Sequence, residues 1–260
     1  MIQIKDLIKV YKTGELEVLA LRGATLEVSE GEIVAIMGPS GCGKTTLLNI
    51  IGGLDRPTAG KIISNGIELS NLSDEGIVQY RKENVGFVFQ FFNLVPWLSV
   101  IENVELPQLI SGKPKHKIRK GTNELLKQVG LLDRAQHKPS ELSGGEQQRT
   151  AIATALANDP PIILADEPTG ELDTRSGSEI LKLFKSLRDD YGKTEIIVTH
   201  DKRVGFIADR VLAIEDGKII AELEKDTTPR MEPLELEKEV TELRWKLNKT
   251  RKLAQDILTT

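Results

Sequence analysis

The residues best suited to chemistry form a glycine-rich run near the N-terminus. The run reads, in order, Gly38, Pro39, Ser40, Gly41, Cys42, Gly43, Lys44 and Thr45. This spacing is typical of a loop that binds nucleotide phosphates, because glycines let backbone N–H groups converge on phosphate oxygens. Lys44 would reach the β- and γ-phosphates, and Thr45 would offer its hydroxyl to Mg²⁺. An ordinary glycine-rich turn is the competing interpretation, and it is disfavoured by the strand expected before the loop and the helix expected after it.

Two adjacent acids form the second group of candidate residues. Asp166 and Glu167 directly follow an apolar run at 162–165, which is typical of a strand buried on both faces. An acid at the carboxyl end of such a strand lies in the crevice where α/β sheets bind ligands. We therefore expect Asp166 to hold Mg²⁺ through water, and Glu167 to orient and deprotonate the attacking water. Alone the pair could be a surface turn, but together with the phosphate-binding run it indicates a catalytic site.

The hydrophobic pattern predicts an α/β framework that could position these residues. Strands are expected at residues 2–10, 24–28, 33–37, 85–90, 162–165 and 195–199, and a helix at 45–51. Hairpins are predicted at 61–69, around Asn65-Gly66, and at 211–221, around Asp216-Gly217.

A block of helices at 91–158 interrupts this framework. Ser99 and Glu102 form a capping box that opens the first helix, the second helix spans 115–129, and the third runs from Gly144 to residue 158. A further helix, between the strands at 162–165 and 195–199, is expected to start at a capping box formed by Ser176 and Glu179.

The composition excludes several classes of protein. The 260 residues carry a formal net charge of −4, whereas nucleic-acid binders usually have a basic surplus. No apolar run approaches the ~20 residues that a membrane span needs, so another chain would have to cross any membrane at which this protein acts. The single cysteine, Cys42, excludes an intrachain disulfide and fits a reducing cytoplasm.

A further motif connects the chain to a known family. Residues Leu142, Ser143, Gly144, Gly145 and Glu146, followed by Gln147-Gln148-Arg149, resemble the signature motif of ABC ATPases. In physical terms this is a second helix N-terminus, preceded by a serine, and therefore a second site for an anion on the same chain. The resemblance implies that two subunits pack head to tail as a homodimer on ATP binding, so that each signature completes the nucleotide site of its partner.

The resemblance also assigns roles to residues outside these motifs. It implies that Tyr11 stacks on adenine, that Gln90 touches Mg²⁺ and the attacking water, and that His200 contacts the γ-phosphate. It matches residues 168–173 to the loop after the catalytic Glu, with Asp173 near the dimer seam, and it places Thr46 among the residues that bind nucleotide. The cofactors would be ATP and Mg²⁺, and the catalytic residues Lys44, Gln90, Glu167 and His200. Taken alone, Tyr11 could be edge packing and His200 a satisfied polar residue.

Within the family, several segments resemble the branch of lipoprotein release and macrolide export. They are residues 11–15, 20–23, 49–55 and 86–90. This resemblance implies an ATPase on the inner face of the cell membrane, paired with a separate transmembrane permease subunit. Two functions stay open: transport or export of a substrate, and mechanotransmission, in which the same cycle moves an extracytoplasmic domain. A non-membrane ABC ATPase that acts on DNA or ribosomes is disfavoured, because the chain has no long coiled-coil insertion and no second ATPase unit.

The predicted fold is an α/β P-loop NTPase (RecA-like) core with an N-terminal antiparallel β subdomain and an inserted helical signature subdomain at about 91–158. We expect the ATPase domain to span residues 1–228. A C-terminal helical extension is predicted at 229–260, because apolar residues there recur at alternating spacings of four and three. It would be a short dimer coiled coil or a helix packed on its own domain. The seam consists of Leu236, Val240, Leu243, Leu247, Thr250, Ala254 and Ile257.

Overall fold

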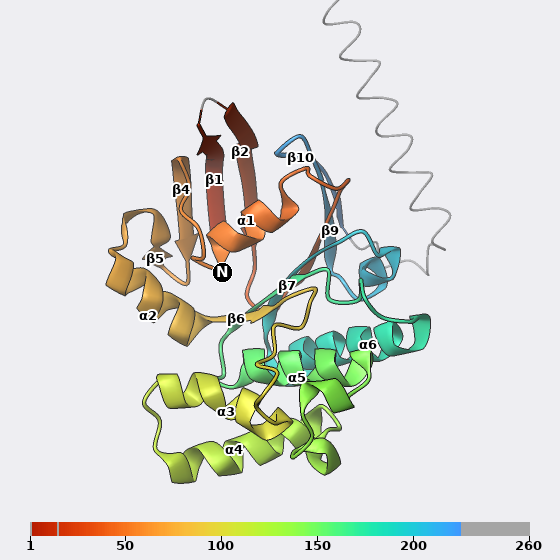
Figure 1. Ribbon diagram of the computed structural model, residues 1–260. Helices are drawn as coiled ribbons and strands as arrows, with labels where there is room; N and C mark the ends of the chain where they lie inside the picture. Colours follow the sequence, from red (N-terminus) through yellow and green to blue (C-terminus); the bar gives the residue numbers. More distant parts are fainter. Residues whose placement is uncertain (1, 15, 225–260) are drawn as a thin grey trace, which may run out of the picture. The chain divides into compact units, whose positions relative to one another are not determined.

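A computed structural model describes residues 2–14 and 16–224 (Figure 1), so the helix predicted at 229–260 lies outside the described residues. The strands are β1 (Ile2–Thr13), β2 (Leu16–Val28), β3 (Ile33–Met37), β4 (Ala59–Ser64), β5 (Ile67–Glu68), β6 (Val85–Val88), β7 (Ile162–Asp166), β8 (Thr194–Thr199), β9 (Arg210–Glu215) and β10 (Lys218–Glu224). The α-helices are α1 (Lys44–Ile51), α2 (Asp74–Asn84), α3 (Val100–Ile110), α4 (Lys115–Gln128), α5 (Gly144–Leu156) and α6 (Thr174–Tyr191).

Two sheets organise these strands. The first is a four-stranded sheet in the order β2-β1-β4-β5, whose neighbours run antiparallel. The second has six strands in the order β10-β9-β3-β8-β7-β6, and its strands β9, β3, β8, β7 and β6 run parallel. Because parallel strands end at the same edge, the loops after β3, β6, β7 and β8 meet there. These loops carry the candidate chemistry.

Alternation along the central strands divides the core into two faces. In β3, Val34 and Ile36 belong to one hydrophobic cluster, whereas Ile33 and Ala35 belong to another. β7 alternates in the same way between Ile162 and Leu164 on one face and Ile163 and Ala165 on the other. A strand buried on both faces reads as a continuous apolar run, which is why these strands were predictable.

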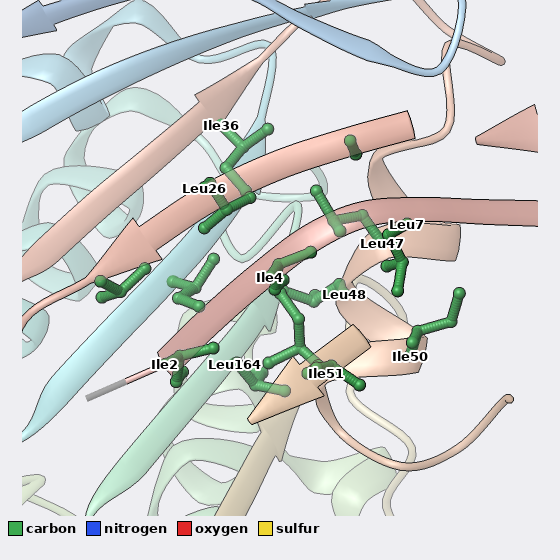
Figure 2. Close-up of a cluster of buried hydrophobic side chains, with 14 of the residues drawn as sticks. Ile2, Ile4, Leu7, Leu26, Ile36, Leu47, Leu48, Ile50, Ile51 and Leu164 are labelled. Carbon is green, nitrogen blue, oxygen red and sulfur yellow. The ribbon is translucent and has the colours of Figure 1, made fainter. Parts of the chain in front are cut away.

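Helix α1 and the antiparallel sheet cover the first face (Figure 2). Leu47, Leu48, Ile50 and Ile51 of α1 are buried in the same cluster as Ile2, Ile4 and Leu7 of β1. Burying a side chain of this size contributes roughly 1.5–3 kcal/mol. The helix that follows the glycine-rich loop is therefore held between the two sheets.

Helices α5 and α6 cover the other face. Ile152 and Leu156 of α5 join Ile180 and Phe184 of α6 in the second cluster. A third cluster joins α5 to α3 and α4, and it forms the core of the predicted helical block. Its members include Val100, Ile101, Val104, Leu126, Ala153 and Ala157.

The structure corrects two local predictions. Helix α2 was not predicted, although Ser73 caps it through the Gly76 N–H and acids occupy its first turn. Its apolar content is low, and only Ile77 and Tyr80 are buried, so the periodic signal was weak. The capping box expected at Ser176 is wrong: α6 starts at Thr174, and the carboxylate of Asp173 accepts hydrogen bonds from the N–H groups of Arg175 and Ser176.

Candidate functional site

The glycine-rich loop joins β3 to α1 and folds around the ammonium group of Lys44. Lys44 Nζ donates to the carbonyl oxygens of Gly38 at 2.8 Å and Pro39 at 3.0 Å. Gly43 has φ of 103°, and a Cβ there would lie 2.5 Å from the carbonyl oxygen of Ala20. A Cβ at Gly38 would lie 2.2 Å from the carbonyl oxygen of Ile214. The loop therefore needs glycine at both positions to keep its tight path, and this path fits a phosphate chain.

Asp166 and Thr45 lie together at the edge of the six-stranded sheet. Burial raises the pKa of Asp166 and the neighbouring charge of Glu167 adds to the shift, while a hydrogen bond from the Thr45 hydroxyl and the charge of Lys44 oppose it. A hydroxyl and a carboxylate are oxygen ligands of the kind that Mg²⁺ prefers. Among residues 2–14 and 16–224, no three His, Cys, Asp or Glu side chains form a metal cluster. Thr45 and Asp166 could supply two oxygen ligands to a bound Mg²⁺.

Glu167 is held in a fixed position by the end of β8. Its Oε2 accepts hydrogen bonds from Thr199 Oγ1 at 2.8 Å and from the backbone N–H of His200 at 3.2 Å, and it lies 3.0 Å from His200 Nδ1. The backbone of Glu167 has φ of 47°, a conformation that is uncommon outside glycine and often found at functional sites. Thr199 was missed as a site residue, although it ends a buried strand directly before His200.

Gln90 lies in the loop after β6 and contacts the loop after β7. Its Nε2 donates to Glu171 Oε1 at 3.1 Å. Thr169, in the same loop, donates its hydroxyl to Asp201 Oδ2 at 2.7 Å. Segments that follow β6, β7 and β8 are thus joined by side-chain hydrogen bonds, and Glu171 is a partner of Gln90 that the sequence did not suggest.

The signature residues form the N-terminus of α5. Ser143 Oγ accepts a hydrogen bond from the backbone N–H of Glu146 at 3.3 Å, and Glu146 Oε2 accepts one from the backbone N–H of Ser143 at 2.8 Å. Hydrogen bonds that the backbone N–H and the hydroxyl of Ser143 donate to the carboxylate lower the pKa of Glu146. Helices α1 and α5 pack on opposite faces of the six-stranded sheet.

Tyr11 lies beside the start of α1, although it comes from β1. Its hydroxyl donates to Asp55 Oδ2 at 2.7 Å and is also hydrogen-bonded to the Thr46 side chain. The residue is 38% exposed. The structure therefore brings a partly exposed aromatic ring next to the phosphate-binding loop, which a planar base could cover.

The loop between β3 and α1, with an acid pair at the end of β7, defines a nucleotide-binding protein of the P-loop class. A model of the ABC transporter family matches residues 21–170. An uncharacterized ABC transporter ATP-binding protein of Thermotoga maritima is 51% identical over 219 residues, which cover 84% of this chain and 93% of that protein. The chain therefore belongs to the ABC transporter family of ATP-binding proteins.

Two other similar proteins refine this placement. A macrolide export ATP-binding/permease protein, MacB, of Rhodopseudomonas palustris is 48% identical over 221 residues, covering 85% of this chain but 34% of that protein. The ATP-binding cassette MJ0796, in a dimeric post-hydrolysis structure bound to ADP and Pi, matches with a TM-score of 0.81 at 45% identity, covering 88% of this chain and all of that one. The predicted fold class is confirmed by these matches, and the chain is an ABC-type ATPase.

Proposed function

We propose that this chain is the ATPase subunit of an ABC transporter, and that it dimerises around two ATP–Mg²⁺ and drives a separate permease subunit. The observation that carries the proposal is that one chain holds both a phosphate loop and a signature motif. The helices that follow them, α1 and α5, pack on opposite faces of one sheet. The chain also covers nearly the whole length of its ATP-binding relatives but one third of an ATP-binding/permease protein. The similarity to a macrolide export protein supports export as the direction of transport, and we propose a lipoprotein, peptide or drug as the exported substrate.

Each group at the sheet edge has a role in the proposed reaction. Lys44 and the loop N–H groups bind the β- and γ-phosphates. Thr45, Asp166 and Gln90 would hold Mg²⁺, which neutralises charge on the phosphates when bound. Glu167 takes the proton of the attacking water, and His200 contacts the γ-phosphate from the end of β8. The hydrogen bonds from Thr199 and His200 keep the Glu167 carboxylate in place for this step.

A composite site shared between two subunits is part of this proposal. Ser143, Gly144, Gly145 and Glu146 would complete the nucleotide site of the other subunit, with Asp173 near the seam. Dimeric structures of MJ0796, at 45% and 46% identity, support this packing. Such a dimer would sit on the inner face of a membrane through its permease. Among the described residues, no helix combines the length and hydrophobicity needed to cross a membrane.

The segment between β6 and α3 is the surface that we assign to the permease. Phe91 is 69% exposed and Trp97 73% exposed, so neither side chain belongs to the core. Asn103 orders the backbone beneath them, because its side chain bonds both the N–H and the carbonyl oxygen of Val95. Exposed aromatic anchors beside Gln90 would let a bound partner sense the nucleotide site.

Trp97→Ala is expected to weaken permease binding by about 2 kcal/mol or more, the range for a buried hot spot. The ATPase activity of the isolated subunit should stay within about threefold of wild type, because Trp97 is exposed and is not one of the proposed catalytic residues. The permease is first identified by co-purification of the wild-type chain from membranes, and its affinity for each variant is then measured in detergent. Tyr191→Ala, which removes another exposed aromatic at the end of α6, is the control. Unchanged permease affinity for Trp97→Ala would remove this surface from the coupling site.

The predicted C-terminal helix should be dispensable for chemistry. A chain ended after Pro229 keeps every proposed site residue and is expected to bind ATP with wild-type affinity, while its assembly or regulation weakens. Equilibrium titration with ATP, compared with gel filtration of both chains, checks this. Loss of ATP binding on truncation would instead make residues 230–260 part of the ATPase core.

A further inference from the structure

A network outside the phosphate loop fixes the position of Tyr11. Asp55 lies in the segment that follows α1 and accepts from both Tyr11 and Lys9: Tyr11 Oη lies 2.7 Å from Oδ2, and Lys9 Nζ lies 2.5 Å from Oδ1. Lys9 Nζ also donates to the carbonyl oxygen of Arg56 at 2.8 Å. One carboxylate therefore joins two side chains of β1 to the end of α1.

The two side chains of β1 also contact each other. Lys9 and Tyr11 are two residues apart, so they point to the same side of the strand. Lys9 Nζ lies over the Tyr11 ring, 4.7 Å from its centroid. A cation at this distance is attracted to the ring face and restrains its tilt. Since the residue is still 38% exposed, Lys9 covers one face and leaves ring surface open.

The charges in this network are set for strong hydrogen bonds. Burial alone would raise the pKa of Asp55, but bonds from Lys9 and Tyr11 outweigh it and hold that pKa below its usual value. Partial burial, together with the bond to Asp55, raises the pKa of the Tyr11 hydroxyl, which therefore keeps the proton that it donates. Asp55 is a full anion in this arrangement, and bonds to an ionised acceptor are the stronger kind.

Asp55 is in turn tied to the helix that carries the phosphate loop. Its backbone N–H donates to the carbonyl oxygen of Asn49 in α1, at 3.2 Å. The start of the same helix meets Tyr11 through the Thr46 side chain. The Tyr11 hydroxyl is therefore connected to both ends of α1. These connections set the position of the Tyr11 ring relative to Lys44 and Thr45.

We propose that Asp55, supported by Lys9, is a positioning residue for the adenine ring of the nucleotide. It would act through Tyr11 by holding the aromatic ring at the height and tilt that a base stacked above the phosphate loop requires. This rests on the proposed function, in which Tyr11 stacks on adenine. Without Asp55 the ring would keep its surface but lose its fixed orientation. The entropy cost of ordering the ring would then offset part of the free energy of stacking.

The test compares two ligands that share phosphates but not a base. Binding of ADP and of inorganic pyrophosphate, each with Mg²⁺, is measured by calorimetry on the full chain. Tyr11→Ala is expected to weaken ADP binding by about tenfold, a loss within the range for one stacked base. Asp55→Ala and Tyr11→Phe should each weaken it by about three- to fivefold, as part of that loss. Pyrophosphate affinity should not change in any of the three.

The double variant and a matched control separate positioning from general stability. Asp55→Ala in the Tyr11→Ala background should cost no further ADP affinity, because the ring it positions is gone. Glu17→Gln, which breaks the exposed Lys12–Glu17 ion pair on the same β1-β2 hairpin, should bind both ligands as wild type does. Tyr11→Phe changes one exposed hydroxyl and tests the same bond even if Asp55→Ala does not fold.

Three results would overturn the inference, and they are distinguishable. If Tyr11→Ala weakens ADP binding but Asp55→Ala and Tyr11→Phe do not, Tyr11 stacks without help from Asp55. If folded Asp55→Ala loses ADP and pyrophosphate equally, the residue supports the phosphate loop and not the base. If Tyr11→Ala binds ADP as wild type does, the proposed stacking role of Tyr11 is itself wrong.

Discussion

Glu167→Gln is expected to bind ATP as wild type does and to hydrolyse it about 10²- to 10⁴-fold more slowly, the usual contribution of a general base. The amide oxygen can still accept the hydrogen bonds from Thr199 and the backbone of His200, so the side chain should stay in place. What it loses is the ability to take a proton. It also loses a negative charge beside the γ-phosphate, and this should favour the closed, ATP-bound dimer.

Single-turnover hydrolysis and gel filtration with ATP measure both effects. The control is Glu179→Gln, which removes an exposed acid of α6 that is paired with Arg149. It should hydrolyse ATP at the wild-type rate and elute as wild type does. A Glu167→Gln chain with full activity would exclude Glu167 as the base, and one that stayed monomeric in ATP would contradict the charge argument.

Lys44→Ala and Ser143→Arg should separate the two halves of the composite site. Lys44 places its ammonium inside the phosphate loop, so its loss is expected to weaken ATP binding by about 100-fold, the upper range for a hydrogen bond to a charged group. Ser143→Arg removes an N-cap at a cost of about 1 kcal/mol in helix stability. It should leave ATP binding by the monomer intact but block dimer closure and turnover by about 100-fold or more.

Mixing the two variants gives the sharper test. In a dimer of one Lys44→Ala chain and one Ser143→Arg chain, the intact phosphate loop of the second chain meets the intact signature of the first, and both defects fall in the other site. One complete site therefore forms, so the mixture should hydrolyse ATP faster than either variant alone. Normal turnover by Ser143→Arg would show that the signature acts within its own chain or not at all.

The parts of the candidate site that can be recognised from the sequence are those in which a motif coincides with a strand end. The glycine-rich loop, the acids after β7 and His200 after β8 all follow continuous apolar runs, and such runs report strands buried on both faces. The capping box predicted at Ser99 is present, and the helix predicted to follow Ser143 begins there with a second capping box. Their pattern of a serine followed three residues later by a glutamate is local, so tertiary packing is not needed to recognise it.

Contacts between distant segments could not be predicted in this way. From the sequence, Asp55 is an acidic residue in a loop. Nothing in the neighbouring residues indicates that it is hydrogen-bonded to Tyr11, 44 residues earlier. The bond between Gln90 and Glu171 joins two loops that only the parallel strand order brings together. At α6 the sequence suggested Ser176 as the cap, but Asp173 caps the helix, and its carboxylate accepts from two N–H groups and from the Ser176 hydroxyl.

Helix α5 belongs to two cores at once, and this bears on how readily a dimer can close. Ile152 and Leu156 bury against the six-stranded sheet, while Ala153 and Ala157 bury against α3 and α4. A helix that is packed on two sides cannot rotate about its axis without exposing apolar surface. The donors at its N-terminus are therefore preorganised, and little conformational entropy remains to be lost there when a second subunit docks.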